Sequence, residues 1–186
     1  FKPEIIFYLA GQSSPKLSFL KDLETHKSNF LGCKYFLETI SNYKINTKFL
    51  NASSSEIFGE SRNKLSLNSK KKPISPYGFA KLNSYKITKH YRENKNLNAY
   101  NAIIFNTESD HRNINYVIPK ICLAAIKAKK YNFKTSFGDL SVTREWNWCN
   151  EQCKYMIKFL KKKPQDFILS NGHSYSAKTM LSYAFQ

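Results

Sequence analysis

Two residues of one predicted helix have types and spacing that suit proton transfer. Tyr77 and Lys81 are four positions apart, so on a helix they project from the same face, one turn apart. A free phenol has a pKa of about 10, and a neighbouring ammonium favours the phenolate. The pair is therefore a candidate proton acceptor for an alcohol that is being oxidised. Tyr85 and Lys89 have the same spacing, and such a pair is also typical of a contact on a helix surface.

The segment upstream of this pair adds a hydroxyl and a carboxylate. Ser54 and Glu56 follow residues 48–53, a short run that predicts a strand. Residues two apart in an extended chain point to the same side, so we expect both side chains to converge with Tyr77 and Lys81. Without that pair, the serines would indicate only the passage from a strand to a loop.

The elements that must position these residues alternate along the chain. Short apolar runs predict strands at residues 5–9, 48–53, 99–105 and 167–169. Helical periodicity predicts helices at residues 24–41, 77–93, 117–130 and 149–162, and from residue 176 onward. Strands separated by helices predict a parallel sheet with helices on its faces. Because such sheets bind ligands at the carboxyl ends of their strands, we expect chemistry just after Leu9, Ala52 and Phe105.

Composition narrows the class of protein and its partners. The 186 residues are 41% hydrophobic, which supports a buried core and excludes collagen-like, disulfide-scaffold and disordered classes. The net charge of +17 suggests nucleic acid. A phosphate-binding surface is usually clustered and rich in arginine, whereas these lysines are spread along the chain, so we expect no nucleic-acid partner. No apolar run approaches the roughly 18 residues of a membrane span, so we expect a soluble, cytoplasmic protein without a membrane partner.

The cysteines do not form a metal-binding pattern. Cys33, Cys122, Cys149 and Cys153 include no pair with two residues between them. Cys149 and Cys153 share one face of a predicted helix, but no histidine lies near them to complete a zinc site. We therefore expect no metal and reduced thiols.

Several segments, in the same order and spacing, carry a family resemblance. Residues 53–59 read Ser-Ser-Ser-Glu-Ile-Phe-Gly and are similar to a family Ser-Thr-Ser-Glu-Leu-Tyr-Gly segment. Residues 75–81 resemble its Ser-Pro-Tyr-x-x-x-Lys segment. Further matches lie at residues 8–13, 105–109, 144–146 and 166–169. Together they resemble the GDP-mannose 4,6-dehydratase family, which belongs to the extended short-chain dehydrogenases/reductases (the NAD-dependent epimerase/dehydratase family). Glu56 after Ser55 favours a dehydratase over an epimerase.

The resemblance implies a partial Rossmann-like α/β fold, with a doubly wound parallel sheet and helices on both faces. It implies that residues 1–186 form a single truncated NAD(P)-binding domain, with parts of the substrate-binding region after about residue 107. The chain has 6 glycines and no glycine-rich phosphate loop. We therefore expect it to lack the N-terminal dinucleotide-binding βαβ unit. The resemblance also implies that the chain stops at Gln186, short of a C-terminal substrate lobe. Such a sheet should expose an edge and an apolar face.

The resemblance also implies a reaction, catalysed by a lyase of nucleotide-sugar metabolism and GDP-fucose biosynthesis. GDP-mannose is oxidised at C4 with NADP, loses water across C5 and C6, and is reduced at C6 to give GDP-4-keto-6-deoxymannose. Tyr77 would take the C4 hydroxyl proton, and Lys81 would lower the pKa of Tyr77 and hold the nicotinamide ribose. Ser54, which replaces a family threonine, would bind the C4 oxygen. Glu56 would remove the C5 proton and protonate the leaving hydroxyl.

The remaining site residues are also implied by the resemblance. Cofactor contacts fall on Leu9, Ala10, Gly11, Gln12, Ser13, Glu24, Tyr77, Lys81 and Arg112. Substrate contacts fall on Asn106, Lys120 and Arg144, whose cations suit a pyrophosphate. The complete protein is expected to be a homo-oligomer, and the 186 residues alone to show little or no turnover. Two alternatives stay open: another nucleotide-sugar epimerase or dehydratase, and a non-catalytic basic binding protein on a degenerate fold of this type.

Overall fold

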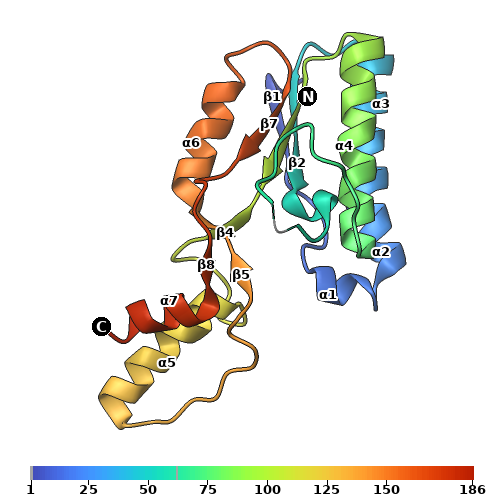
Figure 1. Cartoon of the computed structure of the whole chain (residues 1–186). Helices are drawn as coiled ribbons and strands as arrows, with labels where there is room; N and C mark the ends of the chain where they lie inside the picture. Colours follow the sequence, from blue (N-terminus) through green and yellow to red (C-terminus); the bar gives the residue numbers. More distant parts are fainter. Residues whose placement is uncertain (1, 62) are drawn as a thin grey trace. The chain divides into compact units, whose positions relative to one another are not determined.

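The computed structural model describes residues 2–61 and 63–186. Its backbone forms two compact units (Figure 1). The first unit comprises Phe1–Ile104 and Lys154–Leu169, and the second comprises Phe105–Cys153 and Ser170–Gln186. The assignment of the whole chain to a single domain stays a prediction.

A four-stranded sheet organises the first unit. The strands β1 (Ile5–Tyr8), β2 (Lys48–Ser54), β3 (Ala99–Ile104) and β7 (Asp166–Leu169) lie in this order. Every neighbouring pair is parallel, as the alternation of strands and helices predicts. The carboxyl ends of β1, β2 and β3 therefore meet at one edge of the sheet, where the sequence predicts chemistry.

Helices cover both faces of this sheet, which confirms the predicted fold class (Figure 1). On one face, α3 (Gly32–Asn42) and α4 (Pro76–Lys95) pack on a cluster that includes Phe49. On the other face, α6 (Cys149–Phe159), which belongs to the first unit from Lys154 onward, packs on a cluster that includes Leu50. Neighbouring residues of β2 thus serve opposite clusters, because side chains alternate across a strand.

The predicted helix over residues 24–41 differs in detail from the structure. The chain forms α2 (Asp22–His26), a π-helical segment η1 (Lys27–Leu31) and then α3. The Tyr8 hydroxyl donates a hydrogen bond to the Ser28 carbonyl inside the π-helical segment, at 2.5 Å. A side chain that enters the helical hydrogen-bond ladder is a known cause of such irregular turns. A further short helix, α1 (Pro15–Ser18), was not predicted.

A buried polar network joins β2, β3, β7 and α4. The Asn51 amide donates to Asn101 Oδ1 at 2.9 Å, and the Asn101 amide donates to Asp166 Oδ1 at 3.0 Å. Arg92 pairs with the same carboxylate at 2.8 Å, and the Tyr85 hydroxyl donates to it at 2.7 Å. Burial raises the pKa of Asp166, but the bonds from Arg92, Tyr85 and Asn101 outweigh it, and the net pKa is lowered.

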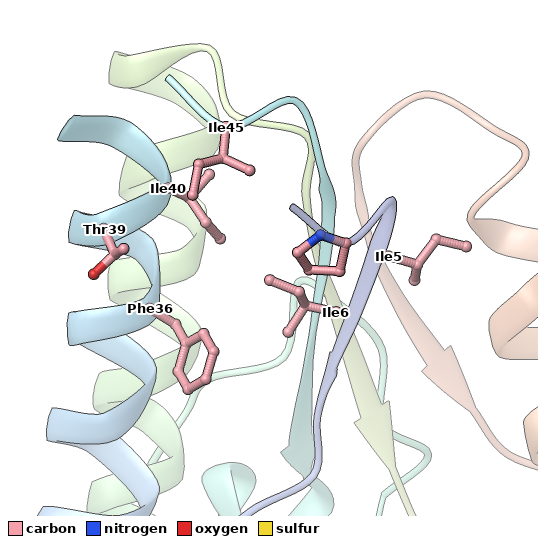
Figure 2. A pocket seen from close by; sticks show the side chains of 7 residues that line it. Ile5, Ile6, Phe36, Thr39, Ile40 and Ile45 are labelled. Carbon is pink, nitrogen blue, oxygen red and sulfur yellow. The ribbon is translucent and has the colours of Figure 1, made fainter. Parts of the chain in front are cut away.

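Strand β1 has an open edge. Among the described residues, only β2 pairs with it, and its side chains Ile5 and Phe7 are 43% and 39% exposed. A hollow of about 400 Å³ lies beside β1 and is lined mostly by apolar residues of the β1 segment and α3. Figure 2 shows Ile6 and Phe36 turned into the space between β1 and α3, and Ile5 turned to the opposite face of β1. The predicted exposed edge and apolar face are therefore present.

The second unit contains two small sheets and two packed helices. Strand β4 (Asn106–Glu108) pairs with β6 (Trp146–Trp148) in parallel, and β5 (Thr143–Arg144) pairs with β8 (Tyr175–Ser176) in antiparallel fashion. The helices are α5 (Val117–Tyr131) and α7 (Ala177–Ala184), close to their predicted ranges. The four short strands were not predicted. None of the helices in the described parts of the chain has the length and apolar content needed to cross a membrane.

Candidate active site

Ser54 and Glu56 lie at the carboxyl end of β2, but the chain between them is not extended. Strand β2 ends at Ser54, and a 3-10 helix η2 (Ser55–Phe58) follows. The expectation of an extended chain from Ser54 to Glu56 is therefore wrong. Ser54 instead caps the helix: its hydroxyl oxygen accepts a hydrogen bond from the Glu56 N–H at 3.2 Å. The Ser54 O–H remains able to donate, and Glu56 is fixed to the turn that Ser54 begins.

The start of α4 packs closely against η2. Ser75 caps α4 by accepting from Gly78 N–H at 3.1 Å, and Pro76 occupies the first turn, where its missing N–H costs nothing. A Cβ atom on Gly78 would lie 2.8 Å from the Glu56 carbonyl oxygen and 2.9 Å from Pro73 Cβ. The absence of a side chain at Gly78 thus lets the first turn of α4 approach η2, and Tyr77 lies in this turn with 8% of its surface exposed.

Lys81 is the most deeply buried charged group of the site. It is 6% exposed, and its Nζ donates to the Ala52 carbonyl of β2 at 2.9 Å. The same Nζ lies 5.8 Å from the centre of the Tyr77 ring. Burial lowers the pKa of Lys81 to about 8, and the electrostatic interaction with Cys33 opposes this shift. The first unit therefore brings together Ser54 with Glu56 and Tyr77 with Lys81, at the end of β2.

The second Tyr-x-x-x-Lys pair has a different environment. The Tyr85 hydroxyl donates to Asp166, and burial with this bond raises the pKa of Tyr85. Lys89 forms an exposed ion pair with Glu93 at 3.7 Å. These contacts favour a structural role for Tyr85 and Lys89.

The predicted cofactor segment, residues 9–13, follows β1 and is held by side chains of α2 and η1. Gly11 has a φ of +127°, which an L side chain rarely adopts. Asn29 is 1% exposed, and its amide donates to the Gln12 carbonyl at 2.9 Å. The Gln12 amide donates to Thr25 Oγ1 at 3.1 Å. Leu9 is 61% exposed, so this segment combines a fixed backbone with an accessible apolar side chain.

The last predicted cofactor residue of the first unit has weaker support. Glu24 lies on α2, and its carboxylate is 58% exposed and pairs with Lys21 at 2.9 Å. An acidic residue in the first turn also suits the positive end of a helix. The structure therefore explains Glu24 without a ligand, and its cofactor contact stays a prediction.

The other four predicted residues lie in the second unit. Asn106 is on β4, where its carbonyl accepts from the Asn147 amide at 3.2 Å. Lys120 is exposed on α5, and Arg144 is exposed on β5. The Arg112 guanidinium stacks 3.6 Å from the centre of the Tyr116 ring, and its Nε lies 3.7 Å from Glu108 Oε2. Burial raises the pKa of Glu108, and Arg112 opposes the shift.

Three residues that shape the site were not singled out from the sequence. Gly78 allows the close approach of α4 to η2, Asn29 fixes the segment after β1, and Ser18 contacts the backbone of Tyr77. A signal for the helix that carries Ser18 was present, because Ser14 followed by Pro15 is a typical helix start. No group of three or more His, Cys, Asp or Glu side chains suited to hold a metal occurs in the described residues.

Comparisons with known proteins cover the whole chain. Residues 1–186 match the family model described as GDP-mannose 4,6 dehydratase. The GDP-mannose 4,6 dehydratase of Cricetulus griseus is 32% identical over 192 residues, which are 99% of this chain and 51% of that protein. The GDP-mannose 4,6-dehydratase of Sinorhizobium fredii is 32% identical over 191 residues, 100% of this chain and 54% of that protein. The chain therefore spans about half the length of these curated relatives.

Solved structures resemble the chain in fold. RMD from Pseudomonas aeruginosa, complexed with NADPH, has a TM-score of 0.89 and 18% identity, covering 97% of this chain and 64% of that chain. The dTDP-glucose 4,6-dehydratase DesIV from Streptomyces venezuelae, with NAD and TYD bound, has a TM-score of 0.85 and 17% identity, covering 97% and 56%. With the parallel sheet and its helices, these likenesses define a Rossmann-like α/β fold. Within this class, the chain belongs to the GDP-mannose 4,6 dehydratase family.

Proposed function

We propose that the protein containing this chain is a GDP-mannose 4,6-dehydratase that uses NADP. The observation that carries the proposal is the packing of α4 on η2. This packing brings Tyr77 and Lys81 to the end of β2, where Ser54 and Glu56 lie. The family match over residues 1–186 supports the same assignment.

The residues present fit the nicotinamide end of a dinucleotide. The Lys81 ammonium uses one of its three N–H donors on Ala52, which leaves donors for the hydroxyls of a ribose. The fixed backbone after β1 lies at the carboxyl end of a parallel strand, where such folds bind dinucleotides. The 6 glycines form no phosphate loop, so the fit concerns the nicotinamide ribose alone. When bound, the nicotinamide supplies the chemistry of accepting a hydride from C4 of the sugar and returning it to C6.

In this proposal, Tyr77 and Lys81 handle the proton of the C4 hydroxyl. Tyr77 accepts that proton as C4 is oxidised, and the nearby Lys81 ammonium stabilises the phenolate. Because Lys81 has a pKa of about 8, it is largely protonated at neutral pH and keeps its charge for this purpose. Its bond to Ala52 holds the ammonium beside the Tyr77 ring.

Ser54 and Glu56 complete the proposed site. The Ser54 oxygen already accepts from Glu56 N–H, and its O–H remains able to donate to the C4 oxygen. Glu56 is partly exposed and takes the proton from C5, which the C4 ketone makes acidic. The same carboxyl group then protonates the hydroxyl that leaves C6, so one water is lost and the carboxylate is restored.

We assign the substrate pyrophosphate to cations of the second unit. Arg144 donates one N–H to the Thr143 carbonyl at 2.9 Å, and its other donors suit a phosphate. Lys120 supplies a second positive charge, Asn106 a polar contact, and Arg112 a cofactor contact. We also propose that the complete protein is a homo-oligomer.

The test uses the product of the full reading frame that contains these residues. Incubated with NADP and GDP-mannose, it should form a keto sugar with the mass of GDP-mannose minus one water. Tyr77→Phe should lower kcat by about 10²- to 10⁴-fold. Tyr85→Phe is the matched control, because it removes a hydroxyl from the other Tyr-x-x-x-Lys pair and should lower stability rather than kcat.

The outcomes separate the alternatives. Activity only on a TDP- or UDP-sugar, in a panel that includes GDP-mannose, would identify another dehydratase or epimerase. A preference for NAD over NADP would overturn the cofactor assignment. Salt-sensitive binding to polyanions, with no turnover of any sugar, would instead favour a non-catalytic binding protein.

A further inference from the structure

A serine of α1 is hydrogen-bonded to the backbone of the proposed catalytic tyrosine. Ser18 has no exposed surface, and its Oγ accepts a hydrogen bond from Tyr77 N–H at 3.1 Å. The same hydroxyl donates to the Pro15 carbonyl at 2.5 Å. The Ser18 hydroxyl therefore both donates and accepts a hydrogen bond, and the bond that it accepts comes from a residue 59 positions later in the chain.

The first turn of α4 explains why this bond matters. The first N–H groups of a helix have no partner within the helix. Pro76 has no N–H, while Gly78 N–H donates to Ser75 Oγ and Phe79 N–H to the Ser75 carbonyl. The Tyr77 N–H does not donate to Ser75, and Ser18 Oγ is its acceptor instead. A buried N–H left without an acceptor costs about 1–3 kcal/mol, so α4 would shift if Ser18 lost its hydroxyl.

Ser18 is also joined to the segment that follows β1. Ser14 begins α1, and its carbonyl accepts a hydrogen bond from Ser18 N–H at 3.1 Å. Its own N–H donates to the side-chain oxygen of Gln12, whose amide donates to Thr25 Oγ1. A chain of hydrogen bonds therefore runs from the proposed cofactor segment through α1 to Tyr77. All of these residues belong to the first unit.

We propose that Ser18 is a positioning residue, which sets the place of Tyr77 relative to residues 9–13 through its bond to the Tyr77 N–H. This role rests on the proposed function. Ser18 does not touch the reacting atoms. Its effect is to hold the backbone of Tyr77, so that the distance between the phenol and the nicotinamide stays constant during hydride transfer. Small displacements of reacting groups lower the rate of such a step.

The experiment compares two variants that each remove one buried hydroxyl with little change in shape. Ser18→Ala removes the acceptor for Tyr77 N–H. Thr88→Val is the matched control, because Thr88 is also fully buried and its hydroxyl donates to the Ser84 carbonyl within α4. Both should lower the free energy of unfolding, so stability alone does not distinguish them. Ser18→Thr keeps the oxygen and tests rescue.

Two measurements decide the outcome. In the full-frame protein, Ser18→Ala should lower kcat about tenfold or more with KM for GDP-mannose changed less than about threefold, whereas Thr88→Val should alter kcat less than about twofold. In the 186-residue chain, NMR-detected hydrogen exchange at Tyr77 N–H should be about tenfold faster in Ser18→Ala than in Thr88→Val. Ser18→Thr should restore both quantities toward the parent values.

The failure of this inference is separate from that of the proposed function. A parent protein without turnover refutes the function and with it the catalytic side of the inference, and exchange at Tyr77 N–H then tests whether Ser18 holds the Tyr77 backbone. If the parent turns over and Ser18→Ala resembles Thr88→Val in kcat, or if Tyr77 exchange is unchanged, Ser18 is not a positioning residue.

Discussion

The Nζ of Lys81 donates a hydrogen bond to the Ala52 carbonyl at 2.9 Å, and only 6% of the Lys81 surface is exposed to solvent. Ala52 is two residues before Ser54 on β2. The bond therefore fixes the ammonium of α4 to the strand that carries the site hydroxyl. The burial of Lys81 also raises the free-energy cost of keeping its ammonium group charged.

The stability of the chain should depend on pH through Lys81. The folded pKa of about 8 lies below the ordinary value of 10.5, so between these two values the unfolded chain binds the extra proton and stability rises with pH. The contribution amounts to about 2 kcal/mol between about pH 7 and pH 9.5. Urea unfolding of the parent and of Lys81→Met at both pH values checks this, and the rise should be smaller in Lys81→Met by that amount. Equal rises would contradict the assigned pKa.

Gly78→Ala should disturb the site although alanine favours helices. The new Cβ would meet the Glu56 carbonyl oxygen and Pro73 Cβ at under 3.0 Å, so α4 or η2 must move. We expect a loss of about 1–3 kcal/mol in the free energy of unfolding, as for other overpacked sites. Gly138→Ala is the control, because nothing lies within 4 Å of its Cβ position. Similar unfolding midpoints for the two variants would contradict this prediction, because they would show that η2 moves away from the new Cβ without loss of stability.

Asp166 should be required for stability, since it partners three side chains in the core. Asp166→Ala removes the carboxylate partner of Arg92, whose side chain is 11% exposed and keeps only its bond to the Ala99 carbonyl among the described contacts, and the expected loss is up to about 3 kcal/mol. The lowered pKa of Asp166 gives stability above the unfolded pKa that is lost as pH falls through the folded pKa. Glu93→Gln removes an exposed partner of Lys89 and should cost under about 1 kcal/mol. Denaturant titrations of both variants provide the comparison.

Asn29→Ala should weaken the segment proposed to contact the cofactor. It removes donors to the Gln12 and Thr25 carbonyls, at 2.9 and 3.1 Å, from a residue that is 1% exposed. We expect about a tenfold loss of NADP affinity in the full-frame protein, which corresponds to 1.4 kcal/mol. Asn94→Ala serves as the control, because Asn94 bonds only to His90 on the surface of α4 in the described structure. Calorimetric titration that finds equal affinities would separate Asn29 from the cofactor segment.

Local patterns in the sequence were sufficient for the larger elements. The strand over residues 99–105 and the helix over 117–130 agree within one residue with β3 and α5, because apolar periodicity reflects which side of an element is buried. Tyr77 and Lys81 also lie on one regular helix, as their spacing predicts.

Features set by distant contacts were not accessible in this way. The π-helical segment arises beside a bond from Tyr8 to Ser28, twenty residues away. The turn after Ser54 replaces the expected extended chain, because the Ser54 side chain itself captures Glu56 N–H. The partner of Tyr77 N–H is 59 residues upstream, and no local pattern indicates that pairing.

The amides of Asn51 and Asn101 have a consequence for how the sheet assembles. They are direct neighbours in the alignment of β2 with β3, and they bond to each other at 2.9 Å in the fully buried core. A slip of two residues would set Asn51 beside Ala99 or Ile103 and leave amide groups without partners, at about 1–3 kcal/mol each. A slip of one residue would turn apolar side chains to the wrong face. The two asparagines therefore select one alignment during folding, which is the alignment that ends β2 at Ser54.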